Sequence, residues 1–295
     1  MKTGVILVNK PKGFTSFDVI AKMRGMLKER RLGHSGTLDP MAMGVLPVFV
    51  GKATKACDIL PDNEKSYRAG FKLGFMTDTQ DTTGSVTKTS EAKTTEKEIL
   101  AALEGFKGRI SQLPPMYSAV QVGGKRLYDL ARQGIEVERE PREIEVYEIK
   151  LESFNEAEQS GALFISCSKG TYVRTIIHDL GVKLGTYGAM SELTRTSSSG
   201  FVLDECLTLD EIQAAADEGR VDELIKPLDE CFKAYPEIRL SDKQTAMYKN
   251  GIKLEAKKVK GAEKAGIYRV YGDEFLGLAE IKNGEDILRI YKNFW

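Results

Sequence analysis

The most unusual segment of the chain runs from Gly33 to Pro47 and reads GHSGTLDPMAMGVLP. It places a histidine, His34, five residues before a carboxylate, Asp39, between glycines that favour a loop. Because Pro40 restricts the residue before it to extended or turn conformations, we expect Asp39 in a loop rather than in a helix. Such a carboxylate can act as a covalent nucleophile, or it can cap neighbouring backbone amides in a turn. Spacing alone favours the turn.

The segments around this loop are predicted to form regular elements that hold it. Residues 4–9 (GVILVN) are an apolar run typical of a strand, and residues 45–50 predict a second strand. Between them, a Thr-x-x-Asp pattern at Thr15 predicts the start of a helix, and apolar residues follow at helical spacing. We expect cations near the end of this helix to suit its dipole. They are Lys22, Arg24, Lys28, Arg30 and Arg31.

Later segments are predicted in the same way from their periodicity. Residues 65–74 alternate, with Tyr67 on the apolar face of a strand, whereas residues 76–90 are rich in Thr, Asp, Gly and Ser and predict a loop. We expect helices over 95–107, 125–133, 171–184 and 208–224, and strands over 143–153 and 162–168.

Charge is segregated along a chain whose total is neutral, with 43 basic and 43 acidic residues. Residues 1–60 carry ten Lys or Arg against four Asp or Glu, whereas residues 204–230 carry two against ten. One face of the molecule can therefore be basic and suited to nucleic acid, although two ordinary solvated faces fit the same pattern. With four scattered cysteines and two histidines in all, we expect no metal site and no disulfide framework.

The predicted elements favour an α+β fold with two domains. After Pro227 and Pro236, short apolar segments separated by glycines suggest a small β domain over residues 235–295. Residues 1–234 would form the larger domain. No apolar run approaches the ~18 residues of a membrane span, and the N-terminus lacks the features of a signal peptide, so we expect a cytoplasmic protein with no membrane contact.

Several segments together resemble the TruB-type tRNA pseudouridine synthases, in the order of that family. GHSGTLDPMAMGVLPV resembles the family's catalytic motif, and VNKPKGFTSFD its N-terminal motif. KSYRAGFKLGFMTDTQDTTG resembles the strand that carries the active-site tyrosine, and SKGTYVRTIIHDLG the arginine motif. The segment LPPMYSAVQVGGKRLYDLARQGIEVEREPREIEVYE resembles an RNA-gripping insertion, which we place at about residues 113–142. The C-terminal segment loosely resembles a PUA-type RNA-binding domain.

The resemblance implies a fold and an activity. The fold would be a mixed, largely antiparallel sheet with flanking helices, the insertion and a PUA-like β domain. The activity would be isomerisation of the T-loop uridine at position 55 of tRNA to pseudouridine. Because the reaction breaks and remakes one glycosidic bond without hydrolysis or oxidation, it needs no cofactor. The implied partner is the T stem-loop of tRNA, and no obligate protein partner is expected.

Position by position, the resemblance also implies site residues. Asp39 would be the nucleophile, Arg174 the arginine that pairs with it, and Tyr67 the active-site tyrosine. His34 would stack where the flipped base leaves a gap, Tyr172 would contact the substrate, and Leu193 would line the pocket. Phosphate contacts are expected from Lys125, Arg126, Arg132 and Arg139 in the insertion.

Each of these residues has an ordinary structural alternative. Tyr67 can be a core residue of its strand, Tyr172 a packing residue at a helix start, and Arg174 an exposed helix cation. Two other functions also remain open: a guide-dependent relative acting on ribosomal RNA, and an RNA chaperone that folds tRNA without chemistry. Asp39 argues against the chaperone, because a carboxylate repels a phosphate-rich ligand that it does not modify.

Overall fold

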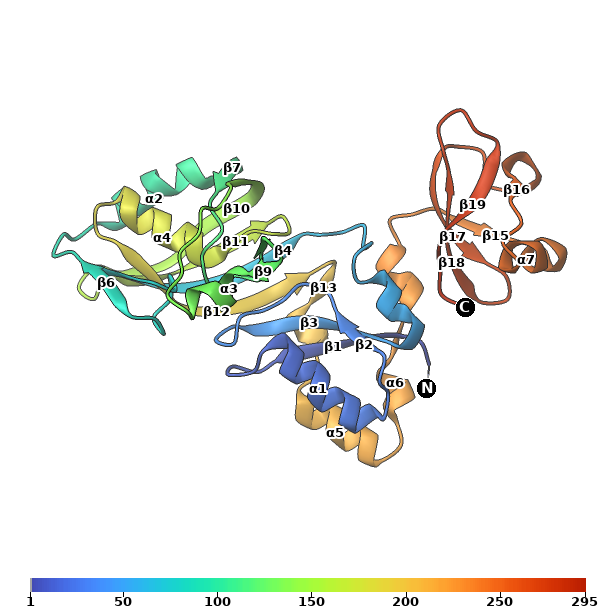
Figure 1. Cartoon of the computed structure of the whole chain (residues 1–295), viewed down its shortest axis with the longest axis horizontal. Helices are drawn as coiled ribbons and strands as arrows, with labels where there is room; N and C mark the ends of the chain where they lie inside the picture. The colour runs from blue at the N-terminus through green and yellow to red at the C-terminus, as the bar shows by residue number, and fades with distance from the viewer. Residues whose placement is uncertain (1) are drawn as a thin grey trace.

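The fold is built around a ten-stranded, largely antiparallel sheet, seen here in a computed structural model that describes residues 2–295 (Figure 1). Its strands are β1 (Gly4–Lys10), β2 (Leu32–His34), β3 (Met43–Val50), β4 (Lys65–Leu73), β7 (Gly108–Gln112), β10 (Arg142–Asn155), β11 (Ser160–Cys167), β12 (Gly188–Ser198), β13 (Phe201–Val202) and β14 (Lys226–Pro227). The main path runs β14-β1-β3-β12-β4-β11-β10-β7, with β2 on β3 and β13 on β12. The expected mixed α+β architecture is confirmed.

Helices and short 3-10 turns connect and cover these strands. The helices are α1 (Ser16–Leu27), α2 (Glu96–Leu103), α3 (Leu127–Ala131), α4 (Val173–Lys183), α5 (Leu209–Asp217), α6 (Val221–Leu224) and α7 (Asp242–Lys249). The 3-10 turns are η1 (Gly51–Ala56), η2 (Glu104–Phe106), η3 (Leu203–Glu205), η4 (Leu228–Phe232) and η5 (Ala256–Lys258). The Thr15–Asp18 capping box that the sequence predicts does begin α1, with both of its reciprocal hydrogen bonds formed.

Three apolar clusters include residues of the large sheet, and two of them are formed with its helices. In one, the alternating apolar face of β4 packs with α2 and α4, as Ala69, Phe71, Ile99 and Ile177 illustrate. In the other, α1 and α5 pack against β1 and β3. Figure 1 shows these two helix pairs at opposite ends of the sheet. The helices bury one apolar stripe each, so most of their stability comes from this packing rather than from intrinsic propensity.

The two halves of the sheet meet at a short parallel seam. There β12 pairs with β3 through only two registered positions, Thr194 with Met43 and Arg195 with Gly44. Gly44 has a φ of +105°, and a Cβ at this position would lie 2.2 Å from the Arg195 carbonyl oxygen, so glycine is required for the close approach. The Asp39 loop leads directly into this seam.

The C-terminal β domain is a five-stranded sheet in the order β15-β17-β18-β19-β16. Its strands are β15 (Glu237–Arg239), β16 (Leu254–Glu255), β17 (Gly266–Tyr271), β18 (Phe275–Ile281) and β19 (Ile287–Asn293). Figure 1 shows this domain standing to one side of the large sheet. The two parts share an apolar contact in which the Phe232 ring stacks near Phe275 and Phe294, with centroids 6.3 and 6.0 Å away.

Several local predictions were wrong. The expected loop over 76–90 contains a hairpin of β5 (Phe75–Thr77) and β6 (Val86–Thr89), because its β-branched residues pair across a turn. Lys125 and Arg126 form β9 (Lys125–Arg126), which pairs with β8 (Gln121–Val122), so the expected basic helix begins only at Leu127. The single helix expected over residues 208–224 is instead two helices, α5 and α6, separated at Gly219, whose φ is +73°.

The prediction for the end of the first helix also needs correction. The helix ends at Leu27, and Lys28 takes a left-handed conformation as its C-cap. Arg30 and Arg31 therefore lie beyond it, and Arg24 is the basic residue in its last turn. Over residues 2–295, no helix combines the length and apolar character that crossing a membrane requires.

Candidate active site

The Asp39 loop is held by a side chain at the start of α1 and by a turn of its own. Ser16, at the start of α1, exchanges two hydrogen bonds with Leu38: its Oγ accepts from the Leu38 amide at 2.9 Å and donates to the Leu38 carbonyl at 3.3 Å. The amide of Ala42 donates to the Asp39 carbonyl at 3.0 Å and closes a turn around Pro40. A turn is therefore present, but the Asp39 main chain closes it, which leaves the carboxylate available for other partners.

The Asp39 carboxylate is paired with Arg174. The Arg174 Nε lies 2.9 Å from Asp39 Oδ2, and Nη2 donates to Oδ1 at 3.3 Å, so the contact is bidentate. Arg174 is 5 % exposed, whereas 37 % of the Asp39 side-chain surface is open. Desolvation raises the pKa of the Asp39 carboxyl, and the Arg174 charge opposes that rise. The pair thus presents an oriented carboxylate at an accessible position.

Arg174 is itself fixed by three further groups. Its Nη1 donates to the Thr79 carbonyl at 2.8 Å, and its Nη2 donates to the Tyr117 carbonyl at 2.9 Å. The buried Asp81 carboxylate lies 3.8 Å from Nη1 and accepts hydrogen bonds from Thr83. The sequence around Asp81 predicts only a Thr-rich loop, because the local pattern does not indicate a buried carboxylate. Planar guanidinium geometry suits this many acceptors, whereas a lysine would satisfy fewer.

Tyr67 lies in the wall of the same site. It is 6 % exposed and belongs to the buried cluster that contains Leu38 and Ala42, which flank the Asp39 turn, and Leu193. On the neighbouring strand β12, Arg195 is its registered partner. Burial raises the pKa of Tyr67 to about 12, and the positive charge of Arg195 opposes that rise. Tyr67 is therefore packed in the core of its strand, as the structural alternative predicts. Its ring also borders the Asp39 loop.

His34 ends the short strand β2, where it pairs with Val48. The side chain is half-buried, and its Nδ1 has no hydrogen-bond partner within residues 2–295. Burial lowers the pKa of His34, and the charge of Arg195 lowers it further, so a neutral ring is favoured at neutral pH. A neutral, half-buried imidazole can stack on a base.

Tyr172 and Leu193 are the two remaining predicted pocket residues. Tyr172 is the N-cap residue of α4, and its backbone is held by both amide atoms of the Gln112 side chain, at 2.8 and 3.0 Å. This contact fixes the start of the helix that carries Arg174. Leu193 is 6 % exposed on β12 and pairs in register with Ala69, beside Tyr67. The fold thus brings Asp39, Tyr67, Arg174 and Leu193 into one region.

The insertion that follows β7 contains an exposed hairpin of β8 and β9. Lys125 and Arg126 are exposed at its turn, and the Arg126 and Arg132 guanidiniums lie 5.8 and 5.5 Å from the centre of the Tyr128 ring. Arg139, which was expected to contact phosphate, is engaged within the protein. It donates to the Pro114 carbonyl at 3.1 Å and pairs with Glu136. Since that side chain is engaged within the segment, it is placed to join the two ends of the insertion.

Two buried cations near the site could not be predicted from the sequence. Lys10 is fully buried, and its Nζ donates to the carbonyls of Phe14 at 2.5 Å and Pro11 at 3.0 Å. Burial lowers the pKa of Lys10 to about 8, which the nearby Asp39 opposes. The second is Arg195. The only local signals are a lysine that ends an apolar strand and an arginine within β12, and neither pattern predicts burial.

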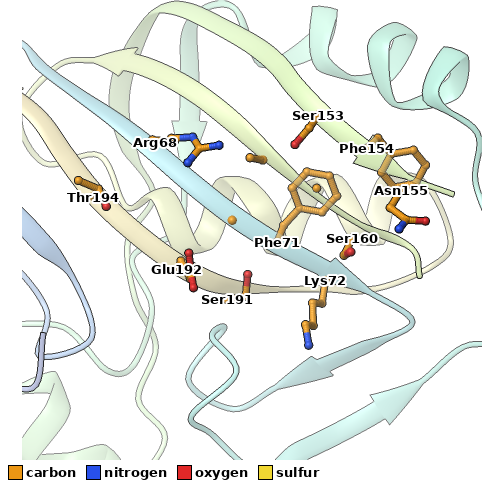
Figure 2. Close-up of a pocket in the computed structure, with 13 residues that line it drawn as sticks. Arg68, Phe71, Lys72, Ser153, Phe154, Asn155, Ser160, Ser191, Glu192 and Thr194 are labelled. Carbon is orange, nitrogen blue, oxygen red and sulfur yellow. The ribbon is translucent and has the colours of Figure 1, made fainter. Parts of the chain in front are cut away.

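A depression lies elsewhere, on the sheet face lined by Arg68, Gly70 and Lys72, whose positions alternate with Tyr67 and its apolar neighbours (Figure 2). It has a volume of about 400 Å³, and none of the predicted site residues lines it. Within residues 2–295, no group of three or more His, Cys, Asp or Glu is arranged to hold a metal ion.

Comparison with protein-family models matches three parts of the chain. Residues 24–173 match the N-terminal domain of the TruB family pseudouridylate synthases. Residues 174–233 match the C-terminal domain of tRNA pseudouridylate synthase B, and residues 236–288 match the C-terminal segment of pseudouridine synthase II TruB.

Individual proteins are similar over most of their length. A tRNA pseudouridine synthase B of Bacillus pumilus is 44 % identical over 259 residues, which span 86 % of this chain and 84 % of the relative. One of Clostridium tetani is 41 % identical over 291 residues, or 97 % and 99 % of the two chains. Among solved structures, a chain in a Cbf5–Nop10–Gar1 complex aligns with a TM-score of 0.76 at 25 % identity, covering 99 % of this chain and 85 % of that one.

Proposed function

Because this chain belongs to the TruB family of pseudouridine synthases, we propose that it isomerises a uridine of tRNA to pseudouridine. The target would be the T-loop uridine at position 55. The observation that carries the proposal is the bidentate Arg174–Asp39 pair, in which a buried guanidinium orients a carboxylate that stays open to solvent. A carboxylate held in this way is suited to covalent or proton-transfer chemistry rather than to structural capping.

The reaction breaks the N1–C1′ bond of uridine, rotates the uracil and forms a C5–C1′ bond. N1 gains one proton and C5 loses one, so the exchange balances without an oxidant or a hydrolytic water. Asp39 would assist by attacking C1′ or C6, or by removing the 2′ proton. Arg174 would keep Asp39 ionised and aimed, since a neighbouring cation favours the charged form of a carboxylate.

The target base must leave its stack before Asp39 can reach it. Tyr67 and Tyr172 would provide rings for the flipped base, a contact worth ~1–3 kcal/mol per base. Leu193 would complete the apolar wall of the pocket. His34 would fill the space that the base vacates, and its favoured neutral form suits stacking. In the last step, the Tyr67 oxygen would take the C5 proton.

The RNA would be gripped outside the pocket by two separate surfaces. The exposed Lys125 and Arg126 of the insertion would contact phosphates, which give affinity and register rather than base identity. Residues 235–295 would form an RNA-binding domain, and residues 1–234 the catalytic domain. Recognition would rest on the shape of the T arm and its unstacked loop bases.

Mapping pseudouridine in a T-arm hairpin after incubation with the purified protein tests this proposal. We expect one modified uridine at position 55 and none when that uridine is replaced by cytidine. An Asp39→Asn protein is the matched control for contaminating activity. Modification at another position, or none by the wild-type protein, would contradict the proposal.

The same assay separates the two rival functions. A guide-dependent enzyme would leave the hairpin unmodified until a guide RNA is added. A pure chaperone would form no pseudouridine and would speed tRNA refolding equally well in its wild-type and Asp39→Asn forms. The identity to tRNA pseudouridine synthases, at 44 % and 41 %, is higher than the identity to the chain of the Cbf5–Nop10–Gar1 complex, at 25 %, which favours direct action on tRNA.

A further inference from the structure

Arg195 is a fully buried cation that the proposed roles do not use. It has no exposed surface and is the largest of the side chains that are completely buried. Taking a guanidinium out of water is strongly unfavourable unless charge and hydrogen bonds compensate for the loss. Burying this charge destabilises the folded protein unless its neighbours compensate. The groups around Arg195 therefore indicate what the residue does.

The hydrogen-bond partners of Arg195 leave one side of its guanidinium unused. Nε donates to the Val45 carbonyl at 2.7 Å, and Nη2 donates to the Gly36 carbonyl at 3.1 Å. Both acceptors are neutral main-chain groups on either side of the Asp39 turn. Nη1 has no hydrogen-bond partner among residues 2–295, although it is fully buried. Two neutral carbonyls do not compensate for a whole buried charge.

Tyr67 is the polar side chain that the sheet register places beside Arg195. It is the registered partner of Arg195 on β4, and both residues are buried next to the Asp39 loop. The other titratable groups around the Tyr67 hydroxyl are Cys167 on β11 and Asp39 on its loop. Those two groups oppose ionisation of the phenol, whereas Arg195 favours it. Among these groups, Arg195 alone would stabilise negative charge on that oxygen.

We propose that Arg195 is a positioning residue for Tyr67: it fixes the hydroxyl oxygen and stabilises negative charge on it. This inference rests on the proposed function, in which the Tyr67 oxygen takes the C5 proton. For the protons to balance, the phenol first gives its own proton to the N1 side, directly or through water, and then recovers one from C5. The phenolate exists only between these two transfers, when the guanidinium beside it matters most.

A purely structural Arg195 makes different predictions. In that case the side chain would only tie Gly36 and Val45 together, and its replacement would change loop geometry and stability. Fluorinated tyrosine placed at position 67 separates the two roles, because fluorine makes the phenol more acidic without adding a contact to the carbonyls of residues 36 and 45.

The first experiment measures the Tyr67 phenol in the free protein. Fluorotyrosine is incorporated at position 67, and its ¹⁹F signal is titrated in full-length wild-type, Arg195→Lys, Arg195→Gln and Arg68→Gln proteins. We expect the phenol pKa to rise in Arg195→Gln, to rise less in Arg195→Lys, and to stay unchanged in the exposed Arg68 control. Identical titrations in all four proteins would overturn the proposal. If Arg195→Gln does not fold, the phenol pKa of Arg195→Lys is compared with that of wild type, and equal values would overturn the proposal.

The second experiment measures tritium release from tRNA labelled at C5 of uridine. We expect Arg195→Lys to lower kcat at least 10-fold with little change in KM, and fluorotyrosine at position 67 to restore most of that loss. A fluorotyrosine effect of equal size in the wild-type and Arg195→Lys proteins would overturn the proposal. If the wild-type protein releases no tritium, the proposed function fails, while the titration still tests whether Arg195 lowers the pKa of the Tyr67 phenol.

Discussion

Asp39 and Arg174 show how much a short pattern can predict about a site, and where it stops. The resemblance selects both residues, and the structure brings them within 2.9 Å of each other. The spacing of Asp39 before a proline predicts only the turn, which is present. Asp81 and Arg195 could not be predicted, because their importance lies in buried contacts with residues far away in sequence. The sequence around a lone acid in a Thr-rich loop, or around an arginine in a strand, does not indicate that the side chain is buried.

Asp39→Asn should abolish pseudouridine formation, with a loss of at least ~10³-fold, because the amide is a poor nucleophile and a poor base. The substitution keeps the shape of the side chain, so tRNA affinity should stay within a few-fold. Single-turnover conversion and filter binding measure the two effects separately. Conversion by the variant at a rate near that of wild type would remove Asp39 from the chemical step.

The pH dependence of activity should report the contact between Asp39 and Arg174. Burial raises the pKa of Asp39, Arg174 opposes the rise, and the reaction needs the carboxylate, so kcat/KM should fall as pH falls through that pKa. Arg174→Gln removes the opposing charge, so the acid limb should move to higher pH. Arg174→Lys keeps the charge and should move it less. An acid limb at the same pH in all three proteins would argue against this assignment.

His34→Ala should affect base flipping rather than bond cleavage. We expect the defect to be roughly 10-fold larger on a structured T-arm hairpin than on an RNA whose target uridine is already unstacked, because unstacking costs a few kcal/mol. Single-turnover rates on the two RNAs measure the difference. Equal defects would mean that the ring acts in the chemical step or supports the loop.

At the scale of elements, strands and helices with strong periodicity could be predicted, whereas paired turns could not. The alternation of residues 65–74 predicted the correct face of β4, and the capping pattern at Thr15 predicted the start of α1. The hairpin of β5 and β6 was missed because its two strands are three and four residues long, too short for periodicity to appear. The split of residues 125–133 into a strand and a helix was missed for the same reason.

The insertion hairpin should contribute phosphate contacts. Lys125→Ala and Arg126→Ala should each reduce the slope of log affinity against log salt by roughly one unit or less, because each variant releases fewer counterions on binding. Arg139→Ala is the matched control: its guanidinium is engaged with Pro114 and Glu136, so the slope should not change. Unchanged slopes in both exposed variants would remove the hairpin from the RNA surface.

At the scale of the whole molecule, the C-terminal β domain is joined to the rest by packing as well as by the chain. Phe232 is fully buried and stacks between the parts, and Lys55 donates to the Asn293 side chain at 2.7 Å. The sequence predicted the small domain from its glycine-separated strands. It could not predict the shared contact, because Phe232 lies in a short 3-10 turn whose apolar residues show no periodicity.

Phe232→Ala should therefore lower the free energy of unfolding by ~3–5 kcal/mol, as expected for the loss of a large buried ring. Single-turnover conversion at saturating RNA should stay within a few-fold of wild type at temperatures where the variant is folded, because Phe232 belongs to a different apolar cluster from the proposed site residues. Chemical denaturation measures the first effect. A large catalytic defect in a fully folded variant would show that the contact between domains supports the site.

The two-residue seam between β3 and β12 also determines when the site can assemble during translation. The ribosome releases the Asp39 loop early, yet its guanidinium partner comes 135 residues later and the strand that closes the seam later still. For most of translation the loop therefore has neither Arg174 nor β12 against it. The nascent chain would carry an exposed Asp39 carboxylate but no assembled site. Modification of RNA would have to wait until nearly the whole catalytic part has left the exit tunnel.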